Sequence, residues 1–444
     1  MPPNKSLLFF CFSALVLSGI YTSCSPQRTI ATAANKTLVN ASGLKNAHIG
    51  ISIYNAGTKK FLFNRNGQRY FVPASNTKIP TCYVAMKYLG DSICGINITE
   101  IEDKLLLSAT GDPTLLDPEF AKQPVFDFLK NAKKELVALP DNFKTSAWGS
   151  GWSWDDYDAD YLAERSSLPI YSNVLWFQSN NKNNETYFPK NKELIVLASP
   201  AKNQPGTVTR EFRTNNFTWH QSERGAKEIR VPFITSQNLG WSLLSDTLKK
   251  PIHILSAEEV AEAVKNNGRT YPIYSQPTDS VLRILMHRSD NFFAEQLLLM
   301  ASNRLLVQMT TAGIIDTILQ TDFRSLPQKP RWADGSGLSR YNLFTPQDFI
   351  FILNKINEEF GWERIKTIFP TGGTGTLASY YKEDAGAIFA KTGSLSGVVA
   401  LSGFLITRKN KLFLFSILVN NHNTSATEVR KAIEQFITHV RKKY

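Results

Sequence analysis

Three short polar motifs constrain the fold of this chain more than any other feature of its sequence. In chain order they are Ser75-Asn76-Thr77-Lys78, Ser289-Asp290-Asn291 and Lys391-Thr392-Gly393. The first opens an apolar helical run, the second lies between two such runs, and the third precedes a strand-like run at 398–401. Their order and context are informative together. Ser-x-x-Lys alone is a weak signal, because it recurs at Ser42/Lys45, Ser179/Lys182, Ser199/Lys202 and Ser379/Lys382.

The pairing of Ser75 with Lys78 has a direct chemical use. Side chains three residues apart at a helix start share one face, so the hydroxyl and the amine can meet. A serine hydroxyl is a poor nucleophile until a base takes its proton, and a desolvated lysine beside other cations can be neutral enough to take it. Free N–H groups at the helix N-terminus favour a developing oxyanion. The pattern therefore predicts a nucleophilic serine; a simple helix N-cap is the alternative.

The composition is that of an ordinary globular chain. The 444 residues are 42% hydrophobic and 20% charged, which argues against disorder, collagen and a polytopic membrane protein. The length allows about three domains. Four cysteines exclude a disulfide-stapled scaffold. The formal net charge of +12 indicates anionic surroundings, and nucleic acid is the weakest candidate because no block dense in Lys and Arg is present.

The first residues have the layout of a secretory signal. Lys5 precedes the apolar run 7–21, which is too short to span a bilayer comfortably. Thr22-Ser23-Cys24-Ser25 then resembles the lipobox of bacterial lipoproteins, although Tyr21 stands where an aliphatic residue is usual. We expect cleavage before Cys24 and its lipidation, with simple cleavage or an uncleaved anchor as the alternatives. Export also argues against a nucleic-acid partner.

The hydrophobic patterns predict one α/β domain interrupted by a β-rich segment. A hairpin at 49–54 and 60–63 opens the mature chain, and a helix follows from Ser75 to about Leu89. Short strands separated by polar loops fill the middle. Helices and strands of the last part are expected at 280–306, 346–356, 398–406, 412–419 and 425–440. We place the signal peptide at 1–23, the catalytic domain at 24–103 and 266–444, and the β-rich insert, as one or two subdomains, at 104–265.

Other familiar signatures are absent from the sequence. It has no G-x-S-x-G elbow, no H-E-x-x-H and no P-loop, and its six histidines are scattered without metal-ligand spacing. Gly373 to Ala378 fits a dinucleotide pattern formally, but no clear strand precedes it. Cys82 and Cys94 are interpreted as two separate buried thiols, with pairing as the alternative.

The three motifs occur together in penicillin-recognising serine enzymes, and further matches narrow the resemblance. The chain resembles the class C low-molecular-mass penicillin-binding proteins, which are D-alanyl-D-alanine carboxypeptidase/endopeptidases of the peptidase S13 family. The resemblance covers nearly all of the chain after Cys24. It rests on 74–78, 111–115, 152–156, 287–296, 334–340, 375–377 and 391–397.

The resemblance implies a fold and an activity. The expected fold is the penicillin-recognising serine transpeptidase/β-lactamase-like α/β domain, an antiparallel sheet flanked by helices, with the inserted β-rich domain. A class A β-lactamase has no such insert and is much shorter, so the implied activity is a peptidoglycan peptidase that β-lactams inhibit. The implied partners are peptidoglycan pentapeptides or cross-linked stem peptides, β-lactams, and a membrane surface through the lipid anchor, in the periplasm of a bacterial envelope.

The resemblance also implies roles for the motif residues. Ser75 would attack the penultimate D-Ala carbonyl with Lys78 as its base, and Ser289 with Lys391 would relay a proton to the departing amine. Asn291 would hydrogen-bond the substrate amide. Water would then deacylate the enzyme, so no metal or cofactor is implied.

The third motif, together with Ser394, would bind the C-terminal end of the substrate. Thr392 and Ser394 would receive the terminal carboxylate, and Lys391 would add charge for it. The oxyanion hole would use the N–H groups of Ser75 and Ser394. Gly393 would let the substrate backbone approach the strand closely.

Residues near the motifs are expected to be structural. Asp290 is interpreted as a turn or cap residue, Trp152 and Trp154 as part of the insert core, and the loop 334–337 as a positioning element. Asp155 or Asp156 is a candidate to approach the cleft. Pro80 is expected to disturb the first helical turns. A non-catalytic wall-binding lipoprotein and a β-lactamase remain the rival functions.

Overall fold

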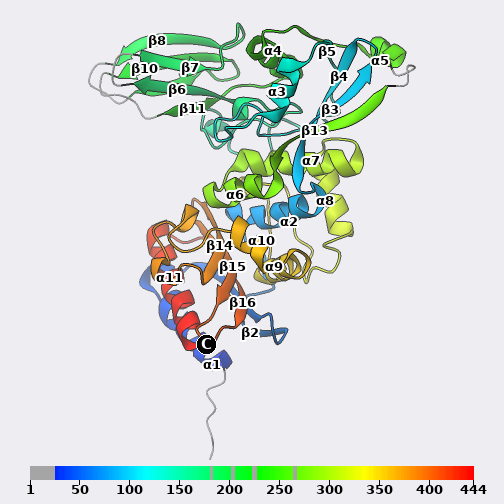
Figure 1. The fold of residues 1–444 in the computed structure, drawn as a ribbon. Helices are drawn as coiled ribbons and strands as arrows, with labels where there is room; N and C mark the ends of the chain where they lie inside the picture. Colours follow the sequence, from blue (N-terminus) through cyan, green and yellow to red (C-terminus); the bar gives the residue numbers. More distant parts are fainter. Residues whose placement is uncertain (1–25, 181–183, 202–205, 223–227, 264–267) are drawn as a thin grey trace, which may run out of the picture.

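The computed structural model describes residues 26–180, 184–201, 206–222, 228–263 and 268–444. Two β-sheet bodies are stacked along an elongated molecule, with a layer of helices between them (Figure 1). The predicted signal segment and Cys24 lie outside the described residues. Within those residues, no helix is long and apolar enough to cross a membrane.

The lower body in Figure 1 is built on a five-stranded antiparallel sheet that joins both ends of the chain. The predicted N-terminal hairpin forms its β1 and β2, and β1 pairs with β16 from the other end of the sequence. In spatial order the strands are β14 (Ile388–Leu395), β15 (Val398–Ile406), β16 (Leu412–Asn420), β1 (His48–Asn55) and β2 (Lys60–Arg65).

Both faces of this sheet are buried because side chains alternate along each strand. On β16, Leu414 and Leu418 belong to one hydrophobic cluster, whereas Phe415 and Ile417 belong to another. The second cluster is covered by α1 (Pro26–Ala34) and α11 (Ala426–Lys443). The first is covered by the middle layer of helices, α2 (Lys78–Tyr88), α6 (Thr278–Arg288), α7 (Asn291–Leu306), α8 (Thr311–Gln320), α9 (Pro346–Phe360) and α10 (Trp362–Ile368).

The upper body combines a second five-stranded sheet with two three-stranded sheets over one hydrophobic cluster. The five-stranded sheet has the order β12 (Ile252–Ile254), β5 (Glu135–Ala138), β4 (Lys104–Ala109), β3 (Ser92–Ile101), β13 (Arg269–Pro277). The smaller sheets are β8 (Ile195–Ala201), β10 (Asn216–Ser222), β9 (Thr207–Arg210), and β11 (Ile229–Pro232), β6 (Val174–Asn180), β7 (Asn184–Phe188). Three helices accompany them, α3 (Pro124–Asn131), α4 (Gln237–Leu248) and α5 (Ala257–Ala263).

The sheet pairing in the upper body reaches beyond the predicted segment 104–265. Strands β3 and β13 lie outside it, yet β3 pairs with β4 and with β13. The strand pairings of both are made within that sheet, so the two strands belong with it physically. We therefore propose that the insert runs from Ser92 to Pro277.

Most predicted elements of the lower body are confirmed. The predicted α/β architecture, an antiparallel sheet flanked by helices, is the one observed. Helix α9 starts as expected, because the Thr345 hydroxyl accepts from the Asp348 N–H and the Asp348 carboxylate accepts from the Thr345 N–H. One element was missed: Lys391-Thr392-Gly393 does not merely precede a strand but lies on its own strand, β14.

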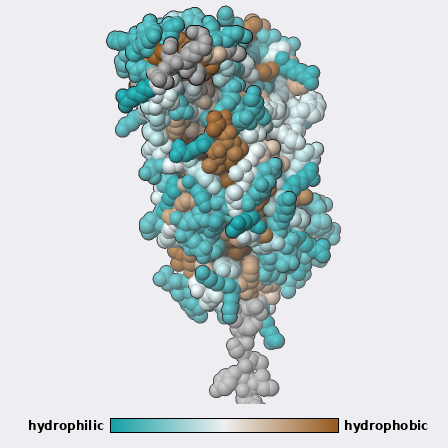
Figure 2. Space-filling view, turned by 90° about the vertical axis from the view of Figure 1, so that its right-hand side faces the viewer, coloured by the Kyte–Doolittle hydropathy of each residue, from teal (hydrophilic) through white to brown (hydrophobic). Residues whose placement is uncertain are grey.

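Figure 2 shows the molecule from the right-hand side of Figure 1. This face is mostly hydrophilic, with a small hydrophobic patch at mid-height. Cys82 is buried and Cys94 is half-buried, and both are free thiols, so the interpretation of separate thiols is confirmed.

Candidate active site

Ser75 lies in a single 3-10 turn, Ala74–Thr77, directly before α2. The Thr77 hydroxyl donates to the Ala74 carbonyl at 2.9 Å, and the Asn76 amide is hydrogen-bonded to the Ser402 hydroxyl of β15 at 2.7 Å. The alternative N-cap role for Ser75 is wrong, because α2 begins at Lys78 with Thr77 before it. The turn holds the Ser75 side chain half-buried at the junction of helix and sheet.

The expected disturbance by Pro80 is absent. Pro80 is the third residue of α2. A backbone N–H in the first turn of an α-helix has no partner inside that helix, so a proline there removes no α-helical hydrogen bond.

The Lys78 amine is fully buried and has three oxygen neighbours. Its Nζ lies 3.1 Å from the Ser75 Oγ, 2.6 Å from the Asn291 Oδ1 and 2.6 Å from the Ser336 carbonyl oxygen. Burial lowers the pKa of Lys78 to about 8, and nearby carboxylates, first among them Asp334, oppose that shift. The amine thus lies next to the hydroxyl with a lowered pKa, which is what a general base at this position would need.

The second motif forms the sharp junction between α6 and α7. Ser289 ends α6 in the left-handed conformation with φ of 61°. The Asp290 carboxylate caps α7 by accepting from the Phe293 N–H at 2.9 Å, which confirms the interpretation of Asp290 as a cap. Asn291 follows as the first residue of α7, and its Nδ2 donates to the Tyr161 carbonyl at 3.0 Å. The junction therefore presents Ser289 and Asn291 toward the first motif.

The third motif brings a second buried amine to the site. Lys391 is fully buried on β14, and its Nζ donates to the Ser289 Oγ and to the Thr392 carbonyl, both at 2.8 Å. Burial, and next the charge of Lys78, holds the pKa of Lys391 well below its usual range. The structure thus joins all three motifs through two lysine amines.

The structure itself requires glycine at position 393, apart from any approach of a substrate. A Cβ at this position would lie 2.7 Å from the Pro73 carbonyl oxygen and 3.0 Å from the Ser75 nitrogen. Strand β14 therefore packs directly against the turn that carries Ser75, and only a residue without a side chain permits this.

The loop that begins at Asp334 holds the site together through hydrogen bonds. The buried Asp334 carboxylate accepts from the Gly337 and Ser339 N–H groups at 2.8 and 2.7 Å and from the Trp152 Nε1 at 2.9 Å. The same loop supplies the Ser336 carbonyl to Lys78. The expected positioning role of this loop agrees with these bonds.

Neither tryptophan belongs to the hydrophobic cluster of the insert, so the predicted core role is wrong for both. Trp152 is half-buried and bonded to Asp334, and Trp154 is 69% exposed. It sits on a short 3-10 turn, Trp154–Asp156, that has no buried residue.

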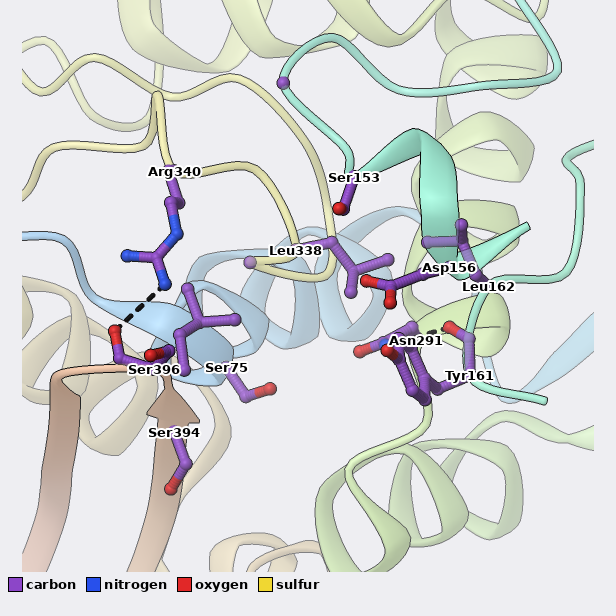
Figure 3. Close-up of a pocket in the computed structure, with 13 residues that line it drawn as sticks. Ser75, Ser153, Asp156, Tyr161, Leu162, Asn291, Leu338, Arg340, Ser394 and Ser396 are labelled. Atoms are coloured by element: carbon purple, nitrogen blue, oxygen red, sulfur yellow. Dashed lines mark hydrogen bonds between the residues drawn. The ribbon is translucent and has the colours of Figure 1, made fainter. Parts of the chain in front are cut away.

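A pocket of about 650 Å³ opens over Ser75 (Figure 3). Asp156 approaches it from the insert side, as one of the two candidate aspartates was expected to do, and Arg340 lies on the opposite side with its Nη2 donating to the Ser396 carbonyl at 2.9 Å. The other residues that line the pocket are Gly151, Ser153, Tyr161, Leu162, Asn291, Gly337, Leu338 and 394–396.

Two basic residues of the site were missed by the sequence analysis. Arg340 ends the segment 334–340, for which only a positioning role of residues 334–337 was predicted, and no sequence pattern indicated Arg430 of α11. The Arg430 Nη2 donates to the Ser394 Oγ at 2.7 Å. No group of three His, Cys, Asp or Glu side chains able to hold a metal occurs within the described ranges.

Comparison with known proteins identifies the family. The model of the D-Ala-D-Ala carboxypeptidase 3 (S13) family matches residues 31–440. The chain belongs to this family. The predicted family and its enzyme class, a serine hydrolase, are thereby confirmed.

Relatives of this S13 chain share its length but little sequence. It is 25% identical over 434 residues to D-alanyl-D-alanine carboxypeptidase of Actinomadura sp. strain R39, covering 86% of this chain and 79% of the relative. It is 22% identical to D-alanyl-D-alanine carboxypeptidase DacB of Haemophilus influenzae, covering 86% and 87%. The crystal structure of penicillin binding protein 4 from H. influenzae superposes with a TM-score of 0.69 at 20% identity, covering 92% and 97%, and shows the same fold.

Proposed function

We propose that this S13 protein hydrolyses the D-Ala–D-Ala or the cross-linking bond of peptidoglycan stem peptides through an acyl-enzyme on Ser75. The observation that carries the proposal is the buried Lys78 amine within 3.1 Å of the Ser75 hydroxyl. Penicillin binding protein 4 of H. influenzae has been crystallised with a β-lactam, and this agrees with inhibition of the present enzyme by such compounds.

The neighbours of Lys78 explain how it would act as a base. A neutral amine has two N–H donors and one lone pair. The Asn291 Oδ1 and the Ser336 carbonyl, both at 2.6 Å, take the two donors. The lone pair is left for the Ser75 O–H, so Lys78 would take the proton as Oγ bonds to the substrate carbonyl carbon.

The developing oxyanion needs donors that are already in place. The N–H groups of Ser75 and Ser394 are the proposed pair, and contact between β14 and the Ser75 turn at Gly393 holds the two segments together. When the tetrahedral intermediate collapses, the C–N bond breaks, and a proton would reach the leaving amine through Ser289 and Lys391, which are in contact at 2.8 Å.

The terminal carboxylate of the substrate would bind beside the third motif. Thr392 and Ser394 offer hydroxyl donors there. Arg430 contacts the Ser394 Oγ at 2.7 Å and would supply a cation at this end. The stem-peptide side chain would extend between Asp156 and Arg340, which line the pocket with opposite charge.

The acylation rate should depend on pH through Lys78. Burial lowers the pKa of this amine to about 8, so the reactive neutral form is lost as the pH falls below that value. We expect kcat/KM to rise about tenfold per pH unit below pH 8 and to level off above it. Stopped-flow acylation by a chromogenic β-lactam measures this, and a rate that is constant from pH 6 to 9 would contradict it.

Gly393→Ala should damage the site without touching a reacting group. The added Cβ must displace the turn that carries Ser75, and a misplacement of about 1 Å costs on the order of 100-fold in rate. Acylation by a fluorescent penicillin is the measurement. The matched control is Gly57→Ala, whose Cβ meets only the Asn55 Oδ1 at 3.5 Å. Equal rates for the two variants would argue against the contact.

Purified muropeptides distinguish the two peptidase activities. Loss of one D-Ala from pentapeptides, detected by mass spectrometry, identifies a carboxypeptidase, and conversion of cross-linked dimers to monomers identifies an endopeptidase. Rapid turnover of penicillin with neither peptide product would favour the β-lactamase alternative. No reaction with either class of compound would favour the non-catalytic wall-binding lipoprotein.

The proposed place of action is the periplasmic side of a bacterial envelope, with Cys24 lipidated. In the sequence, Cys24 stands two positions before Pro26, the first residue of α1. Membrane fractionation of wild type and Cys24→Ser tests the anchor: release of the variant supports it, and equal retention opposes it.

A further inference from the structure

A second hollow, of about 270 Å³, lies next to the active-site pocket, and four of its eight lining residues are aromatic. Trp154 and Phe212 are its most exposed rings, at 69% and 45%, and they meet edge to face with 5.8 Å between their centroids. Large exposed rings gathered in one hollow have no role in the core, so they point to a ligand. The other lining residues are Trp148, Tyr157, Glu164, Arg210, Arg213 and Ile234.

One short turn separates the two cavities. Ser153 and Asp156 line the active-site pocket, whereas Trp154 and Tyr157, their neighbours in sequence, line the aromatic hollow. Figure 3 shows Ser153 and Asp156 at this turn above Ser75 and Asn291. A substrate that extends past Asp156 therefore reaches the aromatic hollow next.

The charges around the hollow disfavour a cationic ligand. Arg210 lies over one face of the Tyr157 ring and Arg213 over one face of the Phe212 ring, each at 5.1 Å from the centroid. A ligand cation would be repelled by these two guanidinium groups, whereas a neutral ligand can contact the remaining ring faces.

The floor of the hollow is polar. Glu164 accepts from the Trp148 Nε1 at 2.9 Å and from the Thr235 N–H at 2.8 Å, and keeps further lone pairs. Arg210 is 3% exposed, and its Nε–H has no hydrogen-bond partner among the described residues. The hollow thus combines apolar rings with buried hydrogen-bonding groups, as sites for neutral polar ligands do.

We infer that the aromatic hollow binds a neutral sugar ring of the peptidoglycan glycan strand while the attached stem peptide occupies the pocket over Ser75. This rests on the proposed function for the identity of the peptide. A pyranose ring presents a face of C–H groups to an aromatic ring and hydroxyl or acetamido groups at its rim, which match the rings and the polar floor. The volume of the hollow lies just below ~300 Å³, the lower end of the range for ligand pockets. The hollow is therefore of a size for one sugar ring and not for several.

The test compares one pentapeptide with and without its disaccharide. For Trp154→Ala, kcat/KM for the disaccharide-pentapeptide should fall about tenfold further than for the free pentapeptide, a difference of about 1.4 kcal/mol, and mainly through KM. Phe212→Ala should do the same, and it changes a segment that contributes nothing to the active-site pocket. Tyr274→Ala is the matched control, because Tyr274 is an exposed ring (52%) on β13 outside both cavities.

Equal losses on the two substrates, or no loss on either, would overturn the inference. A binding measurement separates it from the proposed function. Glycan strands freed of peptide are titrated into the Ser75→Ala protein by calorimetry, which needs no catalysis. If adding Trp154→Ala or Phe212→Ala to the Ser75→Ala protein weakens this binding about tenfold, the sugar site is supported. Absent or unaltered binding opposes it, whereas a wild type inactive on both peptides overturns only the proposed reaction.

Discussion

Ser75→Ala is expected to lower kcat/KM for acyl-D-Ala-D-Ala peptides by about 10⁴-fold or more, because it removes the hydroxyl that would form the acyl bond. The hydroxyl is the only group removed. The turn around it is held by hydrogen bonds of Asn76 and Thr77, and Gly337 packs closely against it. The folded structure should therefore be unchanged. Release of D-Ala, measured by a coupled oxidase assay, gives the rate.

The chain supplies its own control for this variant. Ser379 begins another Ser-x-x-Lys pair, with Lys382, but both side chains are exposed and lie outside the site. Ser379→Ala should keep the wild-type rate. If Ser75→Ala also kept it, the nucleophile would lie elsewhere and the proposed mechanism would be wrong.

Lys78→Met should lower the acylation rate by about 10³-fold, in the range expected for loss of a general base. Methionine has a similar volume and removes the amine that takes the Ser75 proton. The rate should also lose its dependence on pH near 8, because that dependence belongs to Lys78. Fluorescent penicillin labelling over time measures both effects.

The stability of Lys78→Met separates a chemical effect from a structural one. Losing a buried amine removes a desolvation cost, while the Asn291 Oδ1 and Ser336 carbonyl lose a donor. These effects oppose each other, so the free energy of unfolding in urea should change by less than about 2 kcal/mol. Lys382→Met is the matched control at an exposed lysine. A slow variant that is also largely unfolded would contradict a specific role of the amine.

Local signals made much of the fold predictable. The Asn55–Thr58 turn between two apolar runs indicated the β1–β2 hairpin, and Thr345 with Asp348 marked the start of α9. The break between α6 and α7 was visible because polar Ser289-Asp290 interrupts two apolar runs. Each of these depends on residues close in sequence.

Long-range pairing could not be predicted in the same way. Strand β14 carries Lys391, Thr392 and Gly393 in place of an alternating apolar pattern, and it is a strand because it pairs with β15. Strands β3 and β13 pair although most of the insert separates them in sequence. No short-range pattern records such a contact, which is why the insert that we propose, Ser92 to Pro277, is wider than the predicted one.

In the candidate site, too, contacts between residues close in sequence were predictable and contacts between distant segments were not. Ser75 and Lys78 are linked by helical spacing, so their contact follows from sequence. Asp156, Arg340 and Arg430 reach the site from three separate segments, and no spacing rule connects them. Trp154 looked like a core residue by type, whereas its exposure depends on the turn that carries it.

Mass spectrometry of the penicillin adduct tests the central claim most directly. After incubation with benzylpenicillin, the intact protein should gain the mass of one drug molecule, and peptide mapping should place the adduct on Ser75. The adduct should persist on the scale of the experiment. An adduct on another residue, no adduct at all, or one that disappears while the drug is rapidly hydrolysed would contradict a peptidase that works through Ser75.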